Sequence, residues 1–326
     1  MKTTLWILIV IAIVLFTVIA VISYIMVGII MNRKNQGFAK FGHAMANPDI
    51  VQTSDDPYRL IEDKQNEAAK PFWDSHLTET IYRESFDGLK LFASVFNSNP
   101  DSKKWFIGVH GYRSTGRRDM QVIVHHLVSE GYNALIPDQR AHGKSEGETI
   151  TMGYKESKDF IEWTNWLLER EPDAEIILFG DSMGATTSML TIGSGLPENV
   201  KGAVFDCGYT SAYLEFQSLF KRVLKLPEYP IMPLVNLFTK LRAKYNLKDT
   251  DVRPGLEKNK LPTLFIHGTA DSFVPHDMSY INIDATKGKK ELVLVENAPH
   301  FSSYIYDEKL YFESVNNFLN DNVWGE

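Results

Sequence analysis

Residues 175–184 read Glu-Ile-Ile-Leu-Phe-Gly-Asp-Ser-Met-Gly, an apolar run followed directly by a Gly-x-Ser-x-Gly turn. The Ala/Thr/Met-rich stretch that follows can be helical, so the pattern predicts a strand, a tight turn and a helix. In such a turn the serine adopts a strained backbone conformation, and glycine on both sides removes the collisions that larger side chains would cause. We therefore interpret Ser182 as a nucleophile lifted clear of a sheet edge rather than as part of a structural turn.

Apolar runs that alternate with helical stretches continue on both sides of this turn. Strands are predicted at 89–96, 105–109, 134–137, 175–179, 200–206, 263–267 and 292–296, and helices at 117–129, 154–169, 183–192 and 308–319. Continuous apolar strands between helices indicate a mostly parallel sheet that is covered on both faces. The sequence therefore predicts an α/β fold with residues 89–96 as an outer strand.

One connection is far longer than the usual link between a strand and a helix. About fifty residues separate Cys207 from Lys260, and they are rich in Leu and Phe with prolines at 227, 230 and 233. This composition favours a helical cap, inserted at about 209–260, over the carboxyl edge of the sheet. The alternative is a set of peripheral helices without a gating role.

The groups that a serine nucleophile needs follow it along the chain. A hydroxyl requires a base, a group that orients the base, and donors for the developing oxyanion. Asp271 lies in the loop after the strand that ends at His267, and His300 lies in the loop after the last strand. The order Ser, Asp, His, each at a strand end, predicts a triad in which His300 is the general base and Asp271 orients it. Asp206, also at a strand end, is the alternative acid.

The oxyanion donors are expected to be two backbone amides. One is the N–H of Met183, directly after the nucleophile, and the other comes from the loop 110–114, where Tyr112 follows His-Gly. We expect the Tyr112 side chain to line the acyl or leaving-group pocket. His110 is interpreted as a structural brace of this loop, without a part in proton transfer.

Other chemistry-bearing residues favour structural roles. The charged turn 138–145 is expected to brace neighbouring loops, and Cys207, in an apolar strand pattern, is expected to be a buried, inert thiol. Asp181, beside the nucleophile, either tunes the field at Ser182 or is solvated. His125 and His126 lack a matching carboxylate cluster, so no metal site is expected there.

The N-terminal segment is apolar for longer than any other part of the chain. No charge occurs from Leu5 to Met31, a run of roughly 40 Å as a helix against a hydrocarbon core of about 30 Å. A signal peptide is the alternative, but its apolar region is normally shorter and ends in a small-x-small site. The pattern favours an uncleaved single-pass membrane anchor at 1–34, and the flanking basic residues leave its orientation open.

Composition excludes several classes of protein. With 326 residues, 34 Lys and Arg against 41 Asp and Glu, and a net charge of -7, the chain is not expected to bind nucleic acid. A single cysteine excludes an internal disulfide framework. The length fits the anchor at 1–34, a helical connecting segment at 35–77, and one α/β domain with a cap at 78–322.

Several motifs together resemble those of the α/β-hydrolase superfamily, over about residues 78–322. They are Gly-x-Ser-x-Gly at 180–184, His-Gly at 110–111, Asp-x-Arg-x-His-Gly-x-Ser at 138–145, Gly-x-x-Asp-x-x-Val-Pro at 268–275, and His300. The chain looks closest to membrane-anchored bacterial members related to prolyl-oligopeptidase-like and acyl-transfer enzymes. The resemblance implies an eight-stranded sheet and a cofactor-free acyl-enzyme mechanism of an esterase, lipase, thioesterase or peptidase. Asp181 stands where many relatives have His or another residue.

The sequence therefore predicts a membrane-anchored serine hydrolase that acts on a small-molecule acyl substrate, most readily a carboxylic ester. A peptidase or amidase with the same three residues is the first alternative. A non-catalytic binding protein on the same fold is the second, and the presence of all three residues argues against it.

Overall fold

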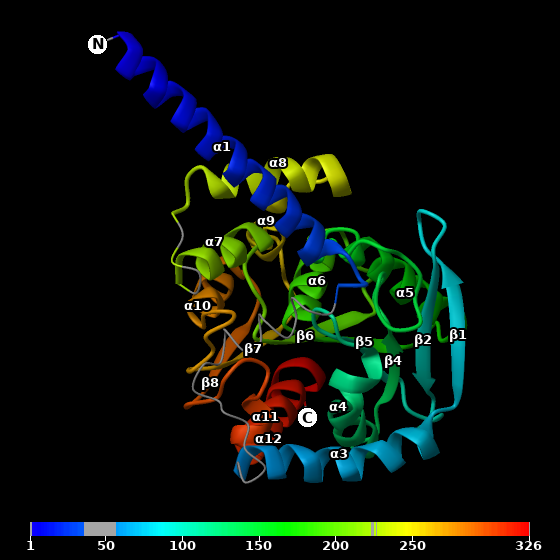
Figure 1. Ribbon diagram of the computed structural model, residues 1–326. Coiled ribbons are helices and arrows are strands. Elements are labelled where there is room, and N and C mark those ends of the chain that lie inside the picture. Colours follow the sequence, from blue (N-terminus) through cyan, green and yellow to red (C-terminus); the bar gives the residue numbers. More distant parts are fainter. Residues whose placement is uncertain (1, 36–56, 223–224, 226, 326) are drawn as a thin grey trace.

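The computed structural model describes residues 2–35, 57–222, 225 and 227–325. Its centre is an eight-stranded sheet in the order β1-β2-β4-β3-β5-β6-β7-β8 (Figure 1). The pairs β1–β2 and β2–β4 are antiparallel, whereas all the other neighbouring strands are parallel. The strands are Glu79–Glu84 (β1), Lys90–Phe96 (β2), Lys104–Val109 (β3), Asn133–Pro137 (β4), Glu175–Asp181 (β5), Val200–Asp206 (β6), Thr263–Gly268 (β7) and Lys290–Val295 (β8).

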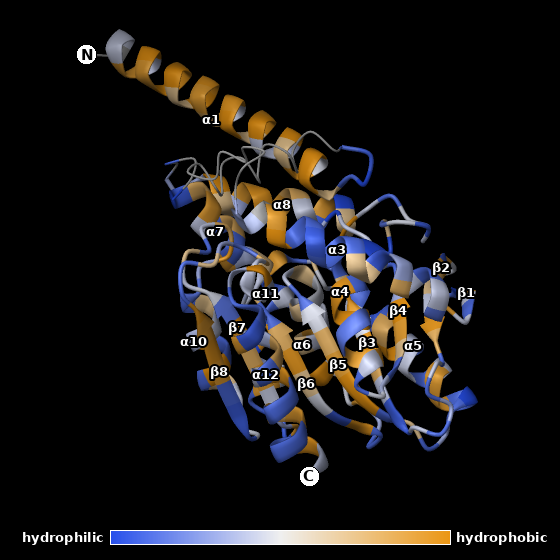
Figure 2. Cartoon of the chain, turned by 90° about the horizontal axis from the view of Figure 1, so that it is seen from below, coloured by the Kyte–Doolittle hydropathy of each residue, from blue (hydrophilic) through white to orange (hydrophobic). Residues whose placement is uncertain are grey.

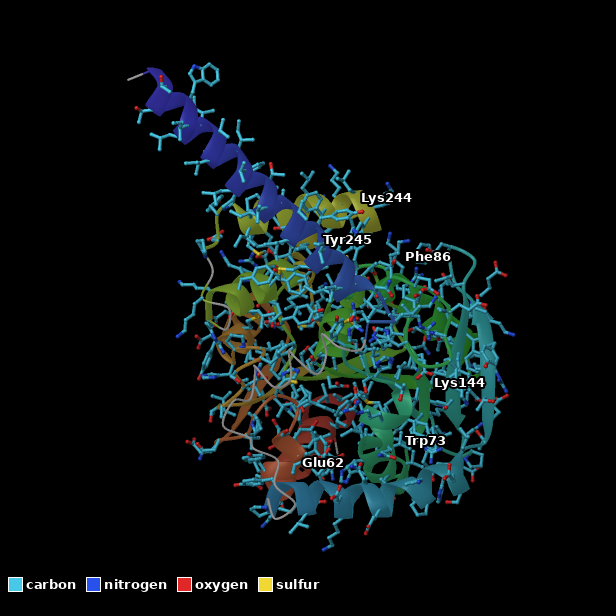
Figure 3. The ribbon with its side chains drawn as sticks, viewed as in Figure 1. Glu62, Trp73, Phe86, Lys144, Lys244 and Tyr245 are labelled. Carbon is cyan, nitrogen blue, oxygen red and sulfur yellow. The ribbon has the colours of Figure 1, made fainter. Side chains whose placement is uncertain are left out.

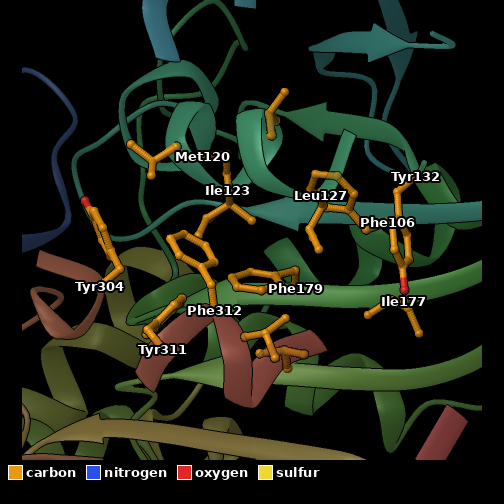
Figure 4. Packing of buried hydrophobic residues seen from close by; sticks show 14 of the residues in the cluster. Phe106, Met120, Ile123, Leu127, Tyr132, Ile177, Phe179, Tyr304, Tyr311 and Phe312 are labelled. Atoms are coloured by element: carbon orange, nitrogen blue, oxygen red, sulfur yellow. The ribbon is translucent and has the colours of Figure 1, made fainter. Parts of the chain in front are cut away.

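Helices cover both faces of this sheet. One face packs against α3, α4, α11 and α12, and the other against α5, α6 and α9. Along each strand successive side chains enter opposite layers, as the two-residue period of a strand requires: Phe106 faces the first layer and Ile107 the second. Figure 4 shows the first layer, where Phe179 of β5 packs among side chains of α4 and α12. These helices are Pro57–His76 (α3), Gly116–Ser129 (α4), Glu156–Arg170 (α5), Met183–Ile192 (α6), Arg253–Leu256 (α9), Ser303–Tyr306 (α11) and Glu308–Leu319 (α12).

The seven strands predicted from the sequence are confirmed. An eighth strand, β1, was not predicted, and its position shows that one prediction was wrong. Residues 89–96 were expected to form an outer strand, but β2 pairs on both sides and β1 lies outside it. The sequence of β1 alternates half-buried and exposed side chains and holds three charged residues, so it lacks the continuous apolar run used to find the others. A short helix at Asp277–Ala285 (α10) was also not predicted.

The long connection between β6 and β7 holds the helices α7 (Ala212–Arg222) and α8 (Ile231–Ala243), a 3₁₀ turn at Leu247–Thr250, and α9. The apolar side chains of α7, α8 and the 3₁₀ turn form one buried cluster with Met183 and Val274, which lie at the carboxyl ends of the parallel strands. Together, α7, α8 and the 3₁₀ turn thus lie over the sheet edge that carries Ser182 (Figure 1). We call these three elements the cap.

The N-terminal helix α1 (Lys2–Met31) is a candidate transmembrane segment. Within the described residues, it is the one helix long and apolar enough to cross a membrane, and Figure 2 shows it as hydrophobic along nearly its whole length. Residues 3–18 are exposed on every side, whereas Val27, Ile30 and Met31 are buried against the cap. The helix therefore extends outward from the domain at its N-terminal end and docks on the domain at its C-terminal end. Of the predicted connecting segment 35–77, residues 36–56 lie outside the described part of the chain, and the rest contains α3.

Candidate active site

The turn at residues 180–184 has the conformation that its sequence predicts. Ser182 has φ 49° and ψ −118°, a strained backbone for a residue with a side chain. A Cβ atom on Gly184 would lie 1.9 Å from the carbonyl oxygen of Val109, and one on Gly180 would lie 2.6 Å from the carbonyl carbon of Gly184. Glycine is therefore required at both positions, because any side chain would push β3 and β5 away from α6.

Three predicted residues from separate loops meet at this turn. The Ser182 hydroxyl lies 2.9 Å from Nε2 of His300, and Nδ1 of His300 lies 2.7 Å from Oδ2 of Asp271. Because the carboxylate can only accept, Nδ1 carries the proton, and Nε2 is left free to accept the serine proton. The three side chains follow β5, β7 and β8, whose carboxyl ends lie at one edge of the sheet.

The Asp271 carboxylate is buried and held by four donors. Its Oδ1 accepts the backbone N–H groups of Phe273 and Val274 at 2.9 and 2.8 Å, and its Oδ2 accepts from His300 and His267. Burial alone would raise the pKa of Asp271, but the two histidines outweigh it and lower this pKa to about 2. Asp271 is therefore ionised at any pH near neutral.

His267 is a part of the site that the sequence reasoning missed. Its Nε2 lies 3.0 Å from Oδ2 of Asp271 and 3.0 Å from the Val274 carbonyl oxygen, so Nε2 carries the proton and donates to both. Its Nδ1 accepts from the Ser279 hydroxyl at 2.6 Å. The only signal in the sequence was a histidine at a strand end, four residues before the acid. The imidazole fixes the orientation of the carboxylate that in turn orients His300.

The electrostatics of His300 suit a base. Burial alone would lower the pKa of the imidazole, but the adjacent Asp271 charge and hydrogen bond raise it above 6.5. The raised pKa makes Nε2 a better proton acceptor, because Asp271 stabilises the imidazolium that forms.

The loop expected to supply an oxyanion donor passes directly beside the nucleophile. A Cβ atom on Gly111 would lie 3.4 Å from Cβ of Ser182. The N–H of Gly111 donates to Asp119 at 2.9 Å and that of Arg113 to Nε2 of His142 at 3.0 Å. Between them, the Tyr112 N–H has no acceptor among the described residues. The Met183 N–H, at the first position of α6, belongs to the helix end whose amides lack intrahelical partners.

Comparison with known proteins identifies the fold and its superfamily. A sequence model described as serine aminopeptidase, S33, matches residues 100–251. An esterase from Pyrococcus furiosus, Pf2001, is 26% identical, with 78% of this chain and 94% of that chain covered and a TM-score of 0.61. The chain belongs to the α/β-hydrolase superfamily. The family match and the esterase neighbour support hydrolase activity for it.

Two further relatives extend the comparison. The Bacillus subtilis protein YqkD, described as uncharacterized, is 28% identical over 199 residues, which are 61% of this chain and 65% of that relative, less than two thirds of its length. The structure of Est1E from Butyrivibrio proteoclasticus with bound ferulic acid is 22% identical, covers 74% of this chain and 98% of that chain, and has a TM-score of 0.58. At this identity Est1E shows the shared fold alone.

In this α/β-hydrolase, the loop 110–114, which is expected to supply an oxyanion donor, is attached to the end of α1. The Tyr112 hydroxyl donates to the Ile30 carbonyl at 2.5 Å, so this side chain points to α1, and the expected role of lining the substrate pocket stays a prediction. The Arg113 guanidinium donates to the carbonyls of Ile29 and Asn32 at 2.8 and 2.9 Å. The last carbonyls of a helix lack intrahelical partners and carry partial negative charge, so Arg113 caps α1.

The predicted bracing role of the charged turn 138–145 is confirmed. The Asp138 carboxylate accepts the N–H groups of Gly116 and Lys144 at 2.8 and 2.9 Å, which ties α4 to the turn. Arg140 is buried between Asp159 and Asp87, at 2.6 and 2.9 Å. His110 is also a brace, as predicted: its Nε2 accepts the Gln139 N–H at 2.9 Å.

The two other acids near Ser182 are buried. Asp206, the alternative acid, accepts from the Tyr311 hydroxyl at 3.1 Å, and burial raises its pKa to about 6. It makes no hydrogen bond to His300, so within the described residues Asp271 is the acid that contacts the histidine. Asp181 is 1% exposed, so the solvated alternative is wrong. Burial and the neighbouring Asp119 raise the pKa of Asp181 well above 3.8, which favours a neutral carboxyl beside the nucleophile.

One group of potential metal ligands occurs within the described ranges, and it overlaps this site. The ligand atoms of Cys207, Asp271 and His300 lie within 4.8 Å of one another. Burial and the charge of Asp206 raise the pKa of the Cys207 thiol well above 9.0, so it stays protonated, and the thiolate is the form that binds metals. The arrangement therefore fits a hydrogen-bonded Asp–His pair beside a buried thiol better than a metal site.

Proposed function

We propose that this α/β-hydrolase is a serine esterase that cleaves acyl esters through Ser182, His300 and Asp271. The observation that carries the proposal is the chain of two hydrogen bonds, 2.9 Å from Ser182 to His300 and 2.7 Å from His300 to Asp271. It links a nucleophile, a base of raised pKa and an ionised acid in the arrangement that acyl transfer requires.

The reaction proceeds in two halves. Nε2 of His300 takes the Ser182 proton as Oγ bonds to the acyl carbon, and the carbonyl oxygen becomes an oxyanion facing the Met183 and Tyr112 amides. The tetrahedral intermediate expels the alcohol, which receives the proton from His300. Water then attacks the acyl-serine while His300 takes its proton, and collapse of the second intermediate releases the carboxylic acid and restores the Ser182 hydroxyl. No cofactor or metal enters either half.

An ester with an apolar acyl group is the substrate class that the surroundings favour. Met183 belongs to a cluster of buried apolar residues that also includes Tyr209 and, from the cap, Phe216 and Phe220. The Pf2001 esterase covers more of the chain than the aminopeptidase family match. Apolar lining binds acyl carbon better than it binds the polar peptide backbone.

One observation favours an amine-bearing substrate as the second candidate. The two carboxyl oxygens of Glu215 in α7 are buried and have no hydrogen-bond partner among the described residues. Burial, with the Asp271 charge, raises the pKa of Glu215 well above 4.5, so an ammonium group brought beside it would gain an ion pair as the carboxyl ionises. The family description of aminopeptidase is consistent with such a substrate.

A fluorophosphonate probe tests the nucleophile directly. The wild type should react with the probe, and Ser182→Ala should not. The control is Ser98→Ala, which follows β2 at the sheet edge opposite to Ser182 and should react like the wild type. Removing the nucleophile of such a unit lowers turnover by about 10⁶-fold. Turnover of p-nitrophenyl esters of graded chain length, compared with aminoacyl p-nitroanilides, separates the two candidates. A folded wild type that neither labels nor turns over any of these would leave a binding protein.

We further propose that α1 is retained as a membrane anchor. Its last turn is part of the domain: the Met31 carbonyl accepts the Ile150 N–H at 2.8 Å, and the carbonyls of Ile29 and Ile30 accept from Arg113 at 2.8 and 3.2 Å. A signal peptidase that removed α1 would take these contacts away. Mass spectrometry of the protein purified from membranes tests this: an intact N-terminus supports the anchor, and a mature chain that begins after Met31 refutes it.

A further inference from the structure

The cap helix α8 has an exposed apolar stripe. Exposed residues recur at helical spacing along it, and the large apolar ones are Leu237, which is 47% exposed, and Leu241, which is 57% exposed. Tyr229, just before the helix, is 70% exposed. We define the α8 face as the exposed residues Tyr229, Pro233, Leu237, Lys240, Leu241 and Lys244.

The α8 face lies at the level where α1 leaves the domain. The Tyr24 ring packs edge-to-face on Phe238 of α8 at 5.4 Å between centroids, and the Arg242 guanidinium lies 3.9 Å from the Tyr24 ring centroid. From Thr3 to Tyr24 a helix rises roughly 32 Å, close to the thickness of a hydrocarbon core. If the core begins near Thr3, Tyr24 and Arg242 therefore lie at its far boundary, where aromatic and basic residues of membrane proteins are enriched.

The cap carries charge opposite to that of the whole protein. Residues 212–250 hold seven Lys and Arg against three Asp and Glu, in a chain whose net charge is -7. All seven basic side chains are exposed, whereas Glu215 is buried. Figure 3 shows Lys244 at the end of α8. An exposed apolar stripe flanked by basic residues fits the surface of a bilayer with anionic headgroups.

We propose that the α8 face is a bilayer-docking surface that seats the cap in the anionic headgroup region around α1. Leu237 and Leu241 enter the boundary of the acyl chains, and Lys240 and Lys244 pair with lipid phosphates. The cap that covers Ser182 is then in contact with the membrane itself. The substrate consequence, which rests on the proposed function, is an acyl ester that partitions into the bilayer and reaches Ser182 from the lipid side.

Depth-dependent fluorescence quenching tests the docking without any catalysis. The full-length Ser182→Ala chain receives an environment-sensitive fluorophore at Leu241→Cys, Ile11→Cys or Leu310→Cys, where Ile11 lies mid-α1 and Leu310 is exposed on α12, far from α8 (Figure 1). The native Cys207 is buried, and the parent chain measures its background labelling. In vesicles of phosphatidylcholine and phosphatidylglycerol with brominated acyl chains, labels at 11 and 241 should dim by about half and the label at 310 should not.

Each outcome decides a different question. Quenching at 11 but not at 241 overturns the docking surface while α1 stays a membrane anchor; a second copy or a protein partner covering the α8 face would give this result. Quenching at 241 without quenching at 11 supports docking and refutes the anchor. An absence of quenching at both positions refutes the two proposals together.

The charge part of the proposal has its own variants. In Lys240→Gln/Lys244→Gln the ratio of docked to undocked cap should fall by about fivefold per lysine, because each basic residue near an anionic surface contributes on that scale. Lys287→Gln/Lys289→Gln is the matched control, since these lysines are exposed just before β8, at the edge of the sheet opposite to Ser182. A ratio unchanged by the α8 pair, or equal in vesicles without phosphatidylglycerol, overturns the recognition of anionic lipid.

The substrate consequence is measured as a ratio of two turnovers. In Leu237→Ser/Leu241→Ser, with Ser182 intact, the rate on a long-chain ester in vesicles should fall about tenfold relative to the rate on soluble p-nitrophenyl acetate. An unchanged ratio refutes delivery from the bilayer. A wild type inactive on both esters refutes the esterase proposal, whereas the quenching at 241 still decides the docking.

Discussion

Asp271→Asn is the substitution that tests the site most directly, because it keeps the shape of the side chain and removes its charge. The pKa of Asp271 is lowered from 3.8 to about 2, a difference worth about 2 kcal/mol in favour of the ionised form. The variant gives up that stabilisation and should still fold. The pKa is depressed, so this contribution is present above pH 4 and is lost as the pH falls through 3.8 toward 2.

The effect on catalysis is larger than the effect on stability. An amide NH₂ directed at Nδ1 of His300 places the imidazole proton on Nε2, which then cannot accept the Ser182 proton. Loss of the correct tautomer in such a triad lowers turnover by about 10⁴-fold, which corresponds to roughly 5 kcal/mol in the activation barrier. The charge that raises the pKa of His300 is also gone, so any residual activity should show a lower apparent pKa.

The assay is the turnover of a p-nitrophenyl ester, with the rate of fluorophosphonate labelling as a second readout. Asp277→Asn is the control, since this carboxylate is exposed in the first turn of α10 and should have no effect. Asp206→Asn tests the alternative acid. The reasoning is refuted if Asp271→Asn stays within about tenfold of the wild type, or if Asp206→Asn causes the large loss in its place.

Three other outcomes follow from the same contacts. The wild-type kcat/KM should rise with pH through an apparent pKa above 6.5, because His300 must be neutral to accept a proton and its pKa is raised; a profile flat from pH 5 to 8 contradicts this. His267→Phe keeps an aromatic ring but removes a donor to Asp271, so urea unfolding should show a free energy of unfolding lower by about 1–3 kcal/mol, and an unchanged midpoint would count against the contact. In Arg113→Ala, the loop that carries the Tyr112 amide loses its hydrogen bonds to the α1 carbonyls, so kcat should fall more than KM rises. The exposed Arg118→Ala should match the wild type in both constants.

The parts of the site that could be predicted are those fixed by local chain geometry. The turn around Ser182 needs glycine where β3 and α6 come close to each other, and the five consecutive residues 180–184 are enough to predict this. Asp271 and His300 could be placed because a parallel sheet brings the carboxyl ends of its strands to one edge, so position after a strand is enough to predict proximity. Their catalytic roles remain predictions that the substitutions above test.

The parts that could not be predicted depend on contacts between distant segments. His267 belongs to the site through its pairing with Asp271, and a histidine at the end of an apolar strand gives no sign of which way its ring turns. The edge strand β1 was missed because a half-exposed strand lacks a continuous apolar run. In both cases the decisive information is the neighbour, which a pattern along one segment does not contain.

The docking of α1 shows why the sequence predicts a long apolar helix but does not predict which part of that helix packs against the protein. Ser23, Val27 and Ile30 recur at helical spacing and are buried against the protein, but the opposite face of the same turns is equally apolar. Lipid and protein core both select apolar side chains, so the sequence offers no contrast from which to tell one environment from the other. Only the residues that contact the helix distinguish the two environments.

The polar contact that marks the docked end of α1 is made by Arg113, which caps the α1 carbonyls from a loop more than eighty residues away. Because the neighbouring Tyr112 amide is the proposed oxyanion donor, the end of α1 and the proposed site of acyl transfer form one structural unit, whereas the sequence presents them as two separate features.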